Sequence, residues 1–486
     1  MRDFILLYVN GVEHRVSGND AFVSLSDFLR YSLSKCGTKV VCAEGDCGAC
    51  TVFLGRLNAA KNDIEYIPVN ACIQYMYQLD CAHVVTVEGL KVDGSLNRIQ
   101  QSMVDCHGAQ CGYCTPGFVV AMCSLFEHCD KRGELCPVTR QDVSDALTGN
   151  LCRCTGYEAI IKAAMSVDEK EYKRLGVLYP AAPLVEEFRK HHQEPVCVQC
   201  DEAEFFKPTD IAAAVEYKSK NPGTVIVSGG TDVCVNLNKG RIEPTKILVL
   251  THLSGLEELK VNGDTIEVGA RVSLRRLEEF FQESLPEFHH ILWIFGSPQI
   301  RYAGTLAGNI ANGSPIADSL PLLFVSGAEV EVAGLKGERR IKVNQLYSGY
   351  RKMVLSDDEI IVRIHIPMPS KSKKLKLYKV SKREHLDISS FTAAISLDRE
   401  GDKIANAQIA YGGVAAVVLK LSKTEEFLNG KPFSLETFRQ AGESAVKEIT
   451  PISDVRGSKD YRLQLAANIM EKFYFETADE KELVCL

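Results

Sequence analysis

The chain has 486 residues, of which 45% are hydrophobic and 24% charged, and its formal net charge is −7. This composition is ordinary for a soluble globular protein of about three domains and argues against a disordered or fibrous chain. The net negative charge argues against nucleic-acid binding, because neutralising phosphates requires a basic surface. We find neither an apolar run near the roughly 18 residues that span a membrane nor a secretory signal, so we expect a cytoplasmic protein.

The 18 cysteines are the informative part of the composition, and most of them lie between Cys36 and Cys154. The reducing cytosol disfavours structural disulfides. A cysteine-dense third of a cytoplasmic chain therefore indicates metal binding.

Residues 1–90 predict a small α+β domain. Two expected strands, at residues 4–9 and 12–16, flank Asn10-Gly11, which is the strongest short signal for a β-hairpin. A helix is expected at residues 24–33, where apolar positions with helical spacing follow capping serine and aspartate residues. The other expected elements are a loop with three cysteines and strands at residues 51–54 and 83–87.

Residues 91–170 change to a helical pattern and predict a compact domain of four helices. Pro116 opens the second helix at a position where its missing N–H group costs no hydrogen bond. Thr139 and Asp142 approximate a capping box at the start of the third helix. The four helices are expected at residues 96–104, from 115 onward, 139–149 and 157–167.

The remainder of the chain returns to mixed helix and strand patterns. Residues 171–198 are charged and contain proline, and we expect them to form a linker. An α/β domain is expected over residues 199–370 and an α+β C-terminal domain over residues 371–486. The expected helices lie at 211–218, 274–281, 435–447 and 461–476, and the expected strands at 224–227, 246–250, 265–270, 375–380, 391–397 and 405–412.

The first cysteine motif places Cys42, Cys47 and Cys50 in one loop with C-x₄-C-x₂-C spacing, and Cys72 follows downstream. This spacing is typical of plant-type [2Fe–2S] ligation. The two glycines of the loop permit a left-handed backbone without Cβ bulk, so that backbone N–H groups can point at the sulfurs. The alternatives are scattered core thiols or a zinc site, although zinc usually takes two closely spaced cysteine pairs.

The second motif combines Cys111-x-x-Cys114 with Cys152-x-Cys154, and 37 residues separate the two pairs. Each pair lies at the end of an expected helix, where unpaired backbone N–H groups stabilise negative sulfur. The spacing by itself permits either an iron–sulfur cluster or zinc.

Together the motifs CAEGDCGAC…NAC and QCGYCTPG…GNLCRCTGY resemble the two iron–sulfur domains of the molybdenum hydroxylases, the xanthine dehydrogenase and aldehyde oxidase family. The resemblance implies a multidomain α+β protein with a β-grasp ferredoxin-like [2Fe–2S] domain, a four-helix [2Fe–2S] domain, an α/β FAD-binding domain and an α+β C-terminal domain. Asp46 stands where many members have glycine, and we expect no effect on ligation. The implied metal ligands are Cys42, Cys47, Cys50, Cys72, Cys111, Cys114, Cys152 and Cys154.

Two later segments resemble the FAD-binding segments of the same family. The first ends a strand in Gly229-Gly230, a turn whose bare backbone can approach a pyrophosphate. It is not the G-x-G-x-x-G fingerprint, so a Rossmann fold is not implied. The second begins at Phe295, and the charged loop after Lys379 diverges from the family in detail. The implied FAD contacts are Ile226, Val227, Ser228, Gly229, Gly230, Thr231, Asp232, Val233, Phe295, Thr305, Asn309, Ser314, Asp318, Ile361 and Lys379.

The resemblance further implies a function, namely that of the electron-transfer subunit of a molybdenum hydroxylase of the xanthine dehydrogenase type in purine catabolism. A large molybdopterin-binding partner subunit, in an (αβ)₂ heterotetramer, would supply electrons to the helical-domain cluster. They would then pass to the ferredoxin-like cluster, to FAD and to NAD⁺, and no residue of this chain would be a catalytic acid or base. The alternatives are a component of an aldehyde or carbon monoxide dehydrogenase and, in a different class, a zinc-stabilised binding protein without redox activity.

Overall fold

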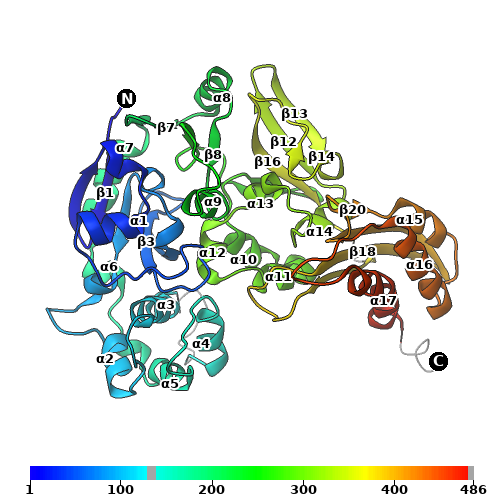
Figure 1. Ribbon diagram of the computed structural model, residues 1–486, viewed down its shortest axis with the longest axis horizontal. Coiled ribbons are helices and arrows are strands. Elements are labelled where there is room, and N and C mark those ends of the chain that lie inside the picture. Colours follow the sequence, from blue (N-terminus) through cyan, green and yellow to red (C-terminus); the bar gives the residue numbers. More distant parts are fainter. Residues whose placement is uncertain (129–137, 371, 480–486) are drawn as a thin grey trace. The chain divides into compact units, whose positions relative to one another are not determined.

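A computed structural model describes residues 1–128, 138–370 and 372–479 of the chain (Figure 1). The chain divides into two compact units. Unit 1 comprises Met1–Ser254 and Gly296–Gly304, and unit 2 comprises Gly255–Phe295 and Thr305–Leu486. A short piece of the flavin region, Gly296–Gly304, therefore belongs to the same unit as both cysteine motifs.

Unit 1 begins with a five-stranded sheet in the order β2-β1-β5-β3-β4. The predicted hairpin around Asn10-Gly11 is confirmed, and β1 also pairs in parallel with β5. Ser24 caps the predicted helix, since its hydroxyl accepts a hydrogen bond from the Asp27 N–H at 3.1 Å. The elements are β1 (Ile5–Val9), β2 (Val12–Val16), α1 (Leu25–Asp27) continued by a π-helical turn (Phe28–Ser32), β3 (Thr51–Leu57), β4 (Ile64–Asn70) and β5 (Ala82–Val85).

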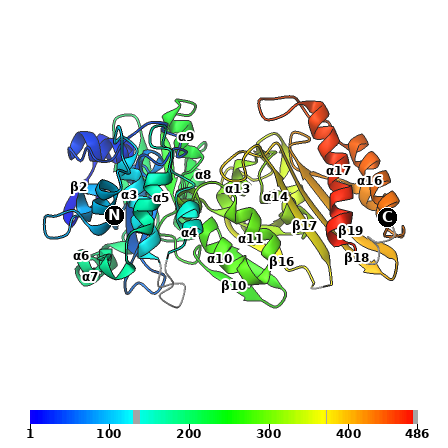
Figure 2. The same cartoon turned by 90° about the horizontal axis from the view of Figure 1, so that it is seen from below.

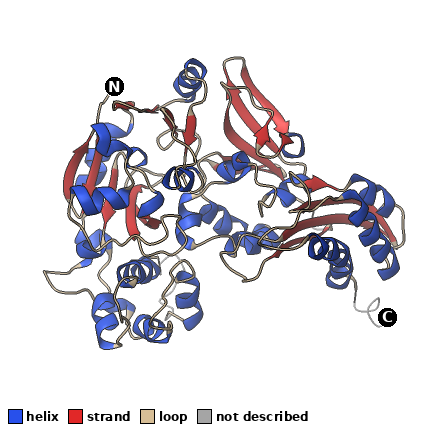
Figure 3. Ribbon diagram, in the orientation of Figure 1, coloured by secondary structure: helices blue, strands red, loops and turns tan. Residues whose placement is uncertain are grey.

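The predicted helical domain follows, and Figure 3 shows its helices without a strand among them. Pro116 lies in the first turn of its helix, and Thr139 and Asp142 form the predicted capping box. The α3 helix is buried along most of its length, with Phe118, Met122 and Phe126 in the apolar core. The helices are α2 (Arg98–Asp105), α3 (Thr115–Glu127), α4 (Arg140–Ala146) and α5 (Glu158–Met165).

The segment expected to be a linker is instead folded and contains α6 (Leu175–Leu178) and α7 (Ala181–His192). Leu184, Val185 and Phe188 of α7 are buried in the same core as α3. These three residues have helical spacing, but the charged residues around them obscured that pattern. The segment therefore contributes to the core of unit 1.

A second sheet completes unit 1, in the order β6-β7-β9-β8. Its inner pairs, β7 with β9 and β9 with β8, are parallel. The elements are β6 (Val196–Gln199), β7 (Glu204–Lys207), α8 (Ile211–Lys220), β8 (Val225–Val227), α9 (Val233–Asn238), β9 (Lys246–Val249) and α12 (Pro298–Ala303).

Unit 2 contains an antiparallel sheet in the order β10-β11-β16-β12-β13. Most of these strands escaped prediction from sequence. The elements of this part are β10 (Leu259–Asn262), β11 (Thr265–Gly269), α10 (Leu274–Ser284), α11 (Pro286–Trp293), α13 (Leu306–Asn312), α14 (Leu320–Val325), β12 (Glu329–Gly334), β13 (Gly337–Lys342), β14 (Tyr347–Gly349), β15 (Lys352–Met353) and β16 (Ile360–Pro367).

The C-terminal part of unit 2 is a four-stranded sheet, β17-β18-β19-β20, packed against helices (Figure 2). Phe391, Ile409, Phe438 and Phe473 join the sheet and the helices in one apolar core. The elements are β17 (Lys374–Val380), β18 (Phe391–Glu400), β19 (Lys403–Gly412), β20 (Leu419–Lys420), α15 (Ser422–Leu428), α16 (Leu435–Glu448) and α17 (Lys459–Thr477). Of the helices that the structure describes, none has both the length and the apolar character to cross a bilayer.

Candidate iron–sulfur and flavin sites

The first thiol group consists of Cys42, Cys47, Cys50 and Cys72. Cys50 immediately precedes β3 and Cys72 follows β4, and the pairing of these two strands brings both cysteines to one end of the sheet. The Cys42 thiol shares hydrogen bonds with the thiols of Cys47 and Cys72, and Cys72 also bonds to Cys50. Sheet register therefore unites the distant fourth cysteine with the loop.

The chemistry of the first thiol group fits an iron–sulfur cluster. Hydrogen bonds among these thiols lower the pKa of Cys42 and, together with burial, raise the pKa of Cys47 and Cys72. The backbone N–H of Glu44 points at the Cys42 sulfur at 3.4 Å. Gly45 and Gly48, the two glycines of the loop, have φ of +74° and +68°, in the left-handed region that was expected.

The second thiol group consists of Cys111, Cys114, Cys152 and Cys154. The Cys154 and Cys111 sulfurs lie 3.7 Å apart. Burial and a hydrogen bond to Cys152 raise the pKa of Cys114 to about 12. The backbone N–H of Thr155 points at the Cys152 sulfur at 3.3 Å. The two cysteine pairs thus converge from the start of α3 and from the turn between α4 and α5.

Both groups offer four sulfur donors and backbone N–H groups directed at sulfur, as iron–sulfur ligation requires. The cysteines that the structure describes are all free of disulfides. Among the surplus cysteines, Cys81, Cys123 and Cys234 are buried as expected of small apolar residues, whereas Cys36 is exposed. Cys129, Cys136 and Cys485 lie outside the described residues.

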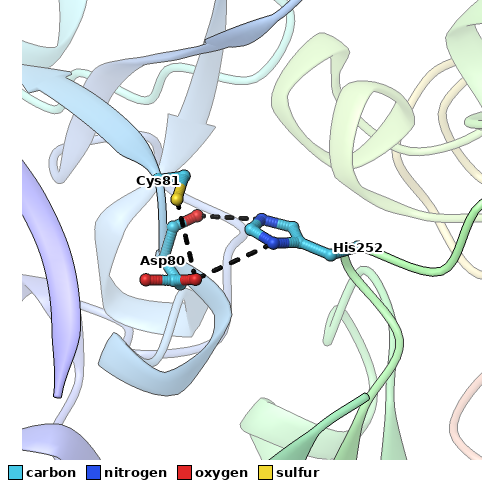
Figure 4. Close-up of side chains that lie close together, drawn as sticks. All are labelled: Asp80, Cys81 and His252. Carbon is cyan, nitrogen blue, oxygen red and sulfur yellow. Dashed lines mark hydrogen bonds and ion pairs between the residues drawn. The ribbon is translucent and has the colours of Figure 1, made fainter. Parts of the chain in front are cut away.

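A third polar group was not expected from sequence, and it joins Asp80, Cys81 and His252 inside unit 1 (Figure 4). The Lys207 ammonium lies 2.5 Å from both the Asp80 carboxylate and His252 Nδ1. The Arg2 guanidinium donates to both oxygens of the same carboxylate, at 2.7 and 2.9 Å. Two protein cations already surround the carboxylate, so this group is a buried ion cluster rather than a metal site.

Burial and the neighbouring charges determine the ionisation states of Asp80 and Cys81. Burial opposes ionisation of Asp80, but Lys207 and Arg2 outweigh that effect and hold the pKa of Asp80 below its usual value. Burial raises the pKa of Cys81 to about 12, with a further contribution from Asp80, so its thiol is neutral.

The predicted FAD residues Ile226–Val233 belong to unit 1 and comprise the end of β8, the turn after it and the first residue of α9. A Cβ atom on Gly229 would overlap the carbonyl oxygen of Ala303, and one on Gly230 would lie 2.8 Å from Gln78 Nε2. The buried Gln78 amide donates to the Ser228 carbonyl at 3.2 Å. This tight turn with bare backbone suits a phosphate-bearing cofactor, and the supporting glutamine had no local sequence signal.

The other predicted FAD residues belong to unit 2. Thr305 caps α13 through a hydrogen bond from the Gly308 N–H at 3.0 Å, and Asn309 lies on the next turn, where its side-chain oxygen accepts from Ser319 at 2.6 Å. The remaining predicted residues, Phe295, Ser314, Asp318, Ile361 and Lys379, come from the end of α11, the loop after α13, β16 and β17.

Two of the predicted FAD residues of unit 2, Asp318 and Lys379, form an ion pair. The Lys379 ammonium lies 2.7 Å from the Asp318 carboxylate, and both side chains are nearly inaccessible. Ser389 donates to the other Asp318 oxygen at 2.6 Å and also accepts from Lys379 at 2.8 Å. The sequence predicted the two charged residues as FAD contacts but did not predict Ser389, which fixes them in place.

Comparison with protein families identifies the domains. A [2Fe-2S] binding domain matches residues 86–165, and an FAD binding domain in molybdopterin dehydrogenase matches residues 201–369. A CO dehydrogenase flavoprotein C-terminal domain matches residues 376–477. These domains define an electron-transfer protein with iron–sulfur and flavin cofactors. In these domains and their order the chain is similar to the iron–sulfur and FAD portion of the molybdenum hydroxylases.

Xanthine dehydrogenases are similar to almost the whole chain. The protein from Emericella nidulans is 28% identical over 99% of this chain and 39% of its own length, and xanthine dehydrogenase 1 from Arabidopsis thaliana is 28% identical over 96% and 39%. The chain therefore spans about two fifths of the length of these curated relatives.

Solved structures are similar to a little over half of the chain. The cyanide-inactivated form of Cu,Mo-CO dehydrogenase is 26% identical, with a TM-score of 0.53 over 55% of this chain and 94% of that one. Quinoline 2-oxidoreductase from Pseudomonas putida 86 is 26% identical, with a TM-score of 0.52 over 56% of this chain and 95% of that one.

Proposed function

We propose that the chain passes electrons from a molybdopterin-containing partner through two [2Fe–2S] clusters to FAD and on to NAD⁺, as part of a xanthine dehydrogenase. The observation that carries this proposal is the presence of two separate groups of four thiols in one compact unit, next in sequence to an FAD-binding domain. When bound, the clusters would carry single electrons and the flavin would combine two of them for hydride transfer to NAD⁺.

Exposure of the thiols supports the direction of transfer. Cys111 and Cys154 of the second thiol group are exposed, whereas Cys50 and Cys72 of the first group are each 2% exposed. Electron transfer requires close approach of donor and acceptor, so an external donor reaches the second group more readily. The chain itself holds the sulfurs, directs backbone N–H groups at them and buries Cys50 and Cys72 of the first group, whereas Cys42 and Cys47 are half-buried.

The proposal includes a large molybdopterin-binding subunit in an (αβ)₂ assembly, and a cytoplasmic location. The similarity of the xanthine dehydrogenases to 96–99% of this chain supports the xanthine type, because one relative accounts for both the iron–sulfur and the flavin parts. The free state of the described cysteines is consistent with a reducing compartment.

A component of an aldehyde or carbon monoxide dehydrogenase is the second candidate. Its support is the structural likeness of the flavin part to CO dehydrogenase and to quinoline 2-oxidoreductase. Co-purification of the partner, followed by turnover with purines, aldehydes, quinoline and carbon monoxide, separates the two candidates, and turnover of xanthine with NAD⁺ is the expected result.

The cofactors are tested on chain purified without air. We expect about four irons, matching sulfide, one FAD and two distinct [2Fe–2S] electron paramagnetic resonance (EPR) signals per chain. Zinc in place of iron, with no visible absorbance, would support the non-redox binding protein instead.

The order of transfer is tested with Cys152→Ser. This variant should lose the second-group signal and xanthine-dependent NAD⁺ reduction, but should still oxidise NADH with an artificial acceptor, because FAD is untouched. Unimpaired xanthine turnover contradicts the proposed order.

The flavin site is tested with Asn309→Leu. The change removes the acceptor of the Ser319 hydrogen bond and places an apolar side chain in the predicted ribityl and phosphate region, so FAD content should fall while iron content stays constant. Full flavin content in this variant places the site elsewhere.

A further inference from the structure

The two thiol groups are connected by one backbone hydrogen bond within unit 1. The Leu151 N–H donates to the Cys47 carbonyl oxygen at 3.0 Å. Cys47 is a predicted ligand of the first cluster, and Leu151 immediately precedes Cys152, a predicted ligand of the second. A chain of covalent bonds and a single hydrogen bond therefore links a sulfur of one group to a sulfur of the other.

Two buried amide side chains support this contact. Asn150 donates from its side chain to the Gly48 carbonyl at 3.1 Å, directly beside Cys47. Gln299 donates to the Asn150 side-chain oxygen at 2.9 Å and to the Thr51 hydroxyl at 3.3 Å. Asn150 and Gln299 are each 1% exposed. Gln299 belongs to α12, so a residue from the flavin region of the sequence completes the contact between the cysteine loops.

The close approach of the loops depends on glycine at three positions. A Cβ atom on Gly48 would lie 2.6 Å from the Asn150 side-chain nitrogen. A Cβ atom on Gly117 of α3 would overlap the Gly48 carbonyl oxygen, and one on Gly149 would overlap the Gln299 side-chain oxygen. The two loops and α3 therefore approach one another more closely than a side chain at any of these three positions would allow.

One buried polar atom at this contact lowers the stability of the fold. The Gln299 side-chain oxygen is buried and lacks a hydrogen-bond partner within the described residues. A buried acceptor without a partner destabilises the fold, and an apolar residue of the same size would avoid that cost. A glutamine at this position thus requires an explanation other than stability.

We propose that Asn150 and Gln299 are positioning residues for electron transfer between the two clusters. They hold the Cys47 and Leu151 backbones in hydrogen-bond contact, and so maintain a bonded route between the thiol groups. Electronic coupling falls more steeply across an empty gap than along covalent and hydrogen bonds, so a loosened contact slows transfer. This inference rests on the proposed function, because it requires both clusters.

The test uses Gln299→Met in the full chain, loaded with both clusters and FAD. Methionine keeps the approximate volume but removes both donated hydrogen bonds. Both EPR signals and both midpoint potentials should be retained. After photoreduction by a rapid flash, freeze-quench EPR should show that the electron redistributes between the clusters several-fold more slowly than in the unmodified chain.

The control is Asn97→Ala, which removes the N-cap of α2 in the same helical domain without touching the cysteine loops. It should lower stability and leave redistribution at its original rate. If Asn97→Ala slowed redistribution as much as Gln299→Met does, the rate would depend on the general stability of the domain and not on the contact between the loops.

Asn150→Ala is the second variant, and it should give the same slowing as Gln299→Met. In the unmodified chain, the Leu151 amide should be protected from hydrogen–deuterium exchange, and this measurement decides the matter if both variants lose a cluster. Unchanged redistribution in a variant with both clusters, or rapid exchange at Leu151, overturns the positioning role alone. A chain without iron–sulfur clusters instead overturns the proposed function.

Discussion

The ferredoxin-like domain and the helical domain each gather four thiols, but in different surroundings. In the first, adjacent paired strands bring Cys50 and Cys72 together, and both are almost fully buried. In the second, the cysteines lie at helix ends, and Cys111 and Cys154 are exposed. The comparison shows that four thiols can be gathered either at the end of a sheet or at the surface of a helical domain, and that exposure distinguishes the two groups.

The two domains also differ in what stabilises them. The ferredoxin-like domain is joined to the second sheet of unit 1 by Asp80, which binds Arg2 at the start of the chain and Lys207 of β7. The helical domain depends on an apolar core around Phe118 and Ile160. The ferredoxin-like domain also has an extensive apolar core. We therefore expect loss of core volume to affect both domains and ionic perturbations to affect the ferredoxin-like domain in particular.

Loss of a buried ligand is the largest expected effect. Cys72→Ser should abolish the first-group EPR signal and reduce iron from about four to about two atoms per chain, because each [2Fe–2S] cluster needs four protein ligands. The second-group signal should persist, as measured by EPR on anaerobically purified protein.

The matched control is Cys36→Ser, which changes an exposed cysteine outside both thiol groups. It should retain both signals. Loss of both signals in Cys72→Ser would show that the two groups do not form independently, and the comparison between the domains would then fail.

Breaking the ion cluster is the next largest effect. Asp80→Asn leaves Lys207 and Arg2 buried without their carboxylate and should lower the free energy of unfolding by about 3–5 kcal/mol. The pKa of Asp80 is depressed in the folded protein, so its stabilisation is present above the unfolded pKa of about 3.9 and is lost as pH falls through the lower folded value. Urea unfolding between neutral and acidic pH measures both effects.

Phe118→Ala is the volume control for this experiment. It should cost about 3–5 kcal/mol at every pH in that range, since it removes only buried apolar volume. If the loss in Asp80→Asn is the same at neutral and strongly acidic pH, the carboxylate charge is not its cause.

The smallest expected effect is a difference in the rates at which an iron chelator removes the two clusters. A chelator of iron should remove the second cluster several-fold faster than the first, because Cys111 and Cys154 are exposed and Cys50 and Cys72 are not. The measurement is the decay of the two EPR signals over time. Equal decay would mean that exposure of the thiols does not distinguish the two sites.

Local patterns predicted much of this molecule. The Asn10-Gly11 hairpin, the Thr139 cap and the start of α3 at Pro116 depend on interactions within a few residues, and all three are confirmed. The cysteine motifs also predicted which thiols meet. Cluster ligation requires cysteines at fixed short spacings, so the motif alone predicts which thiols come together.

Long-range contacts could not be predicted in this way. The folding of α7 depends on burial of Phe188 against a distant helix, and its charged composition indicated a linker. Asp80, Lys207 and His252 are far apart in sequence, and none of them has a motif around it. Gln299 was known only as part of a flavin segment, yet its side chain lies among the cysteine loops.

The sequence by itself predicted the class of protein, the cysteines that come together and many of the helices and strands, because short spacings and local hydrogen bonds specify them. Only the tertiary structure decided which thiol group is exposed, how Asp80 is neutralised and which side chains hold the two cysteine loops together. These features arise when residues more than a hundred positions apart pack against one another, as Asn150 and Gln299 do. Packing at such separations depends on the whole fold, and no local pattern records it.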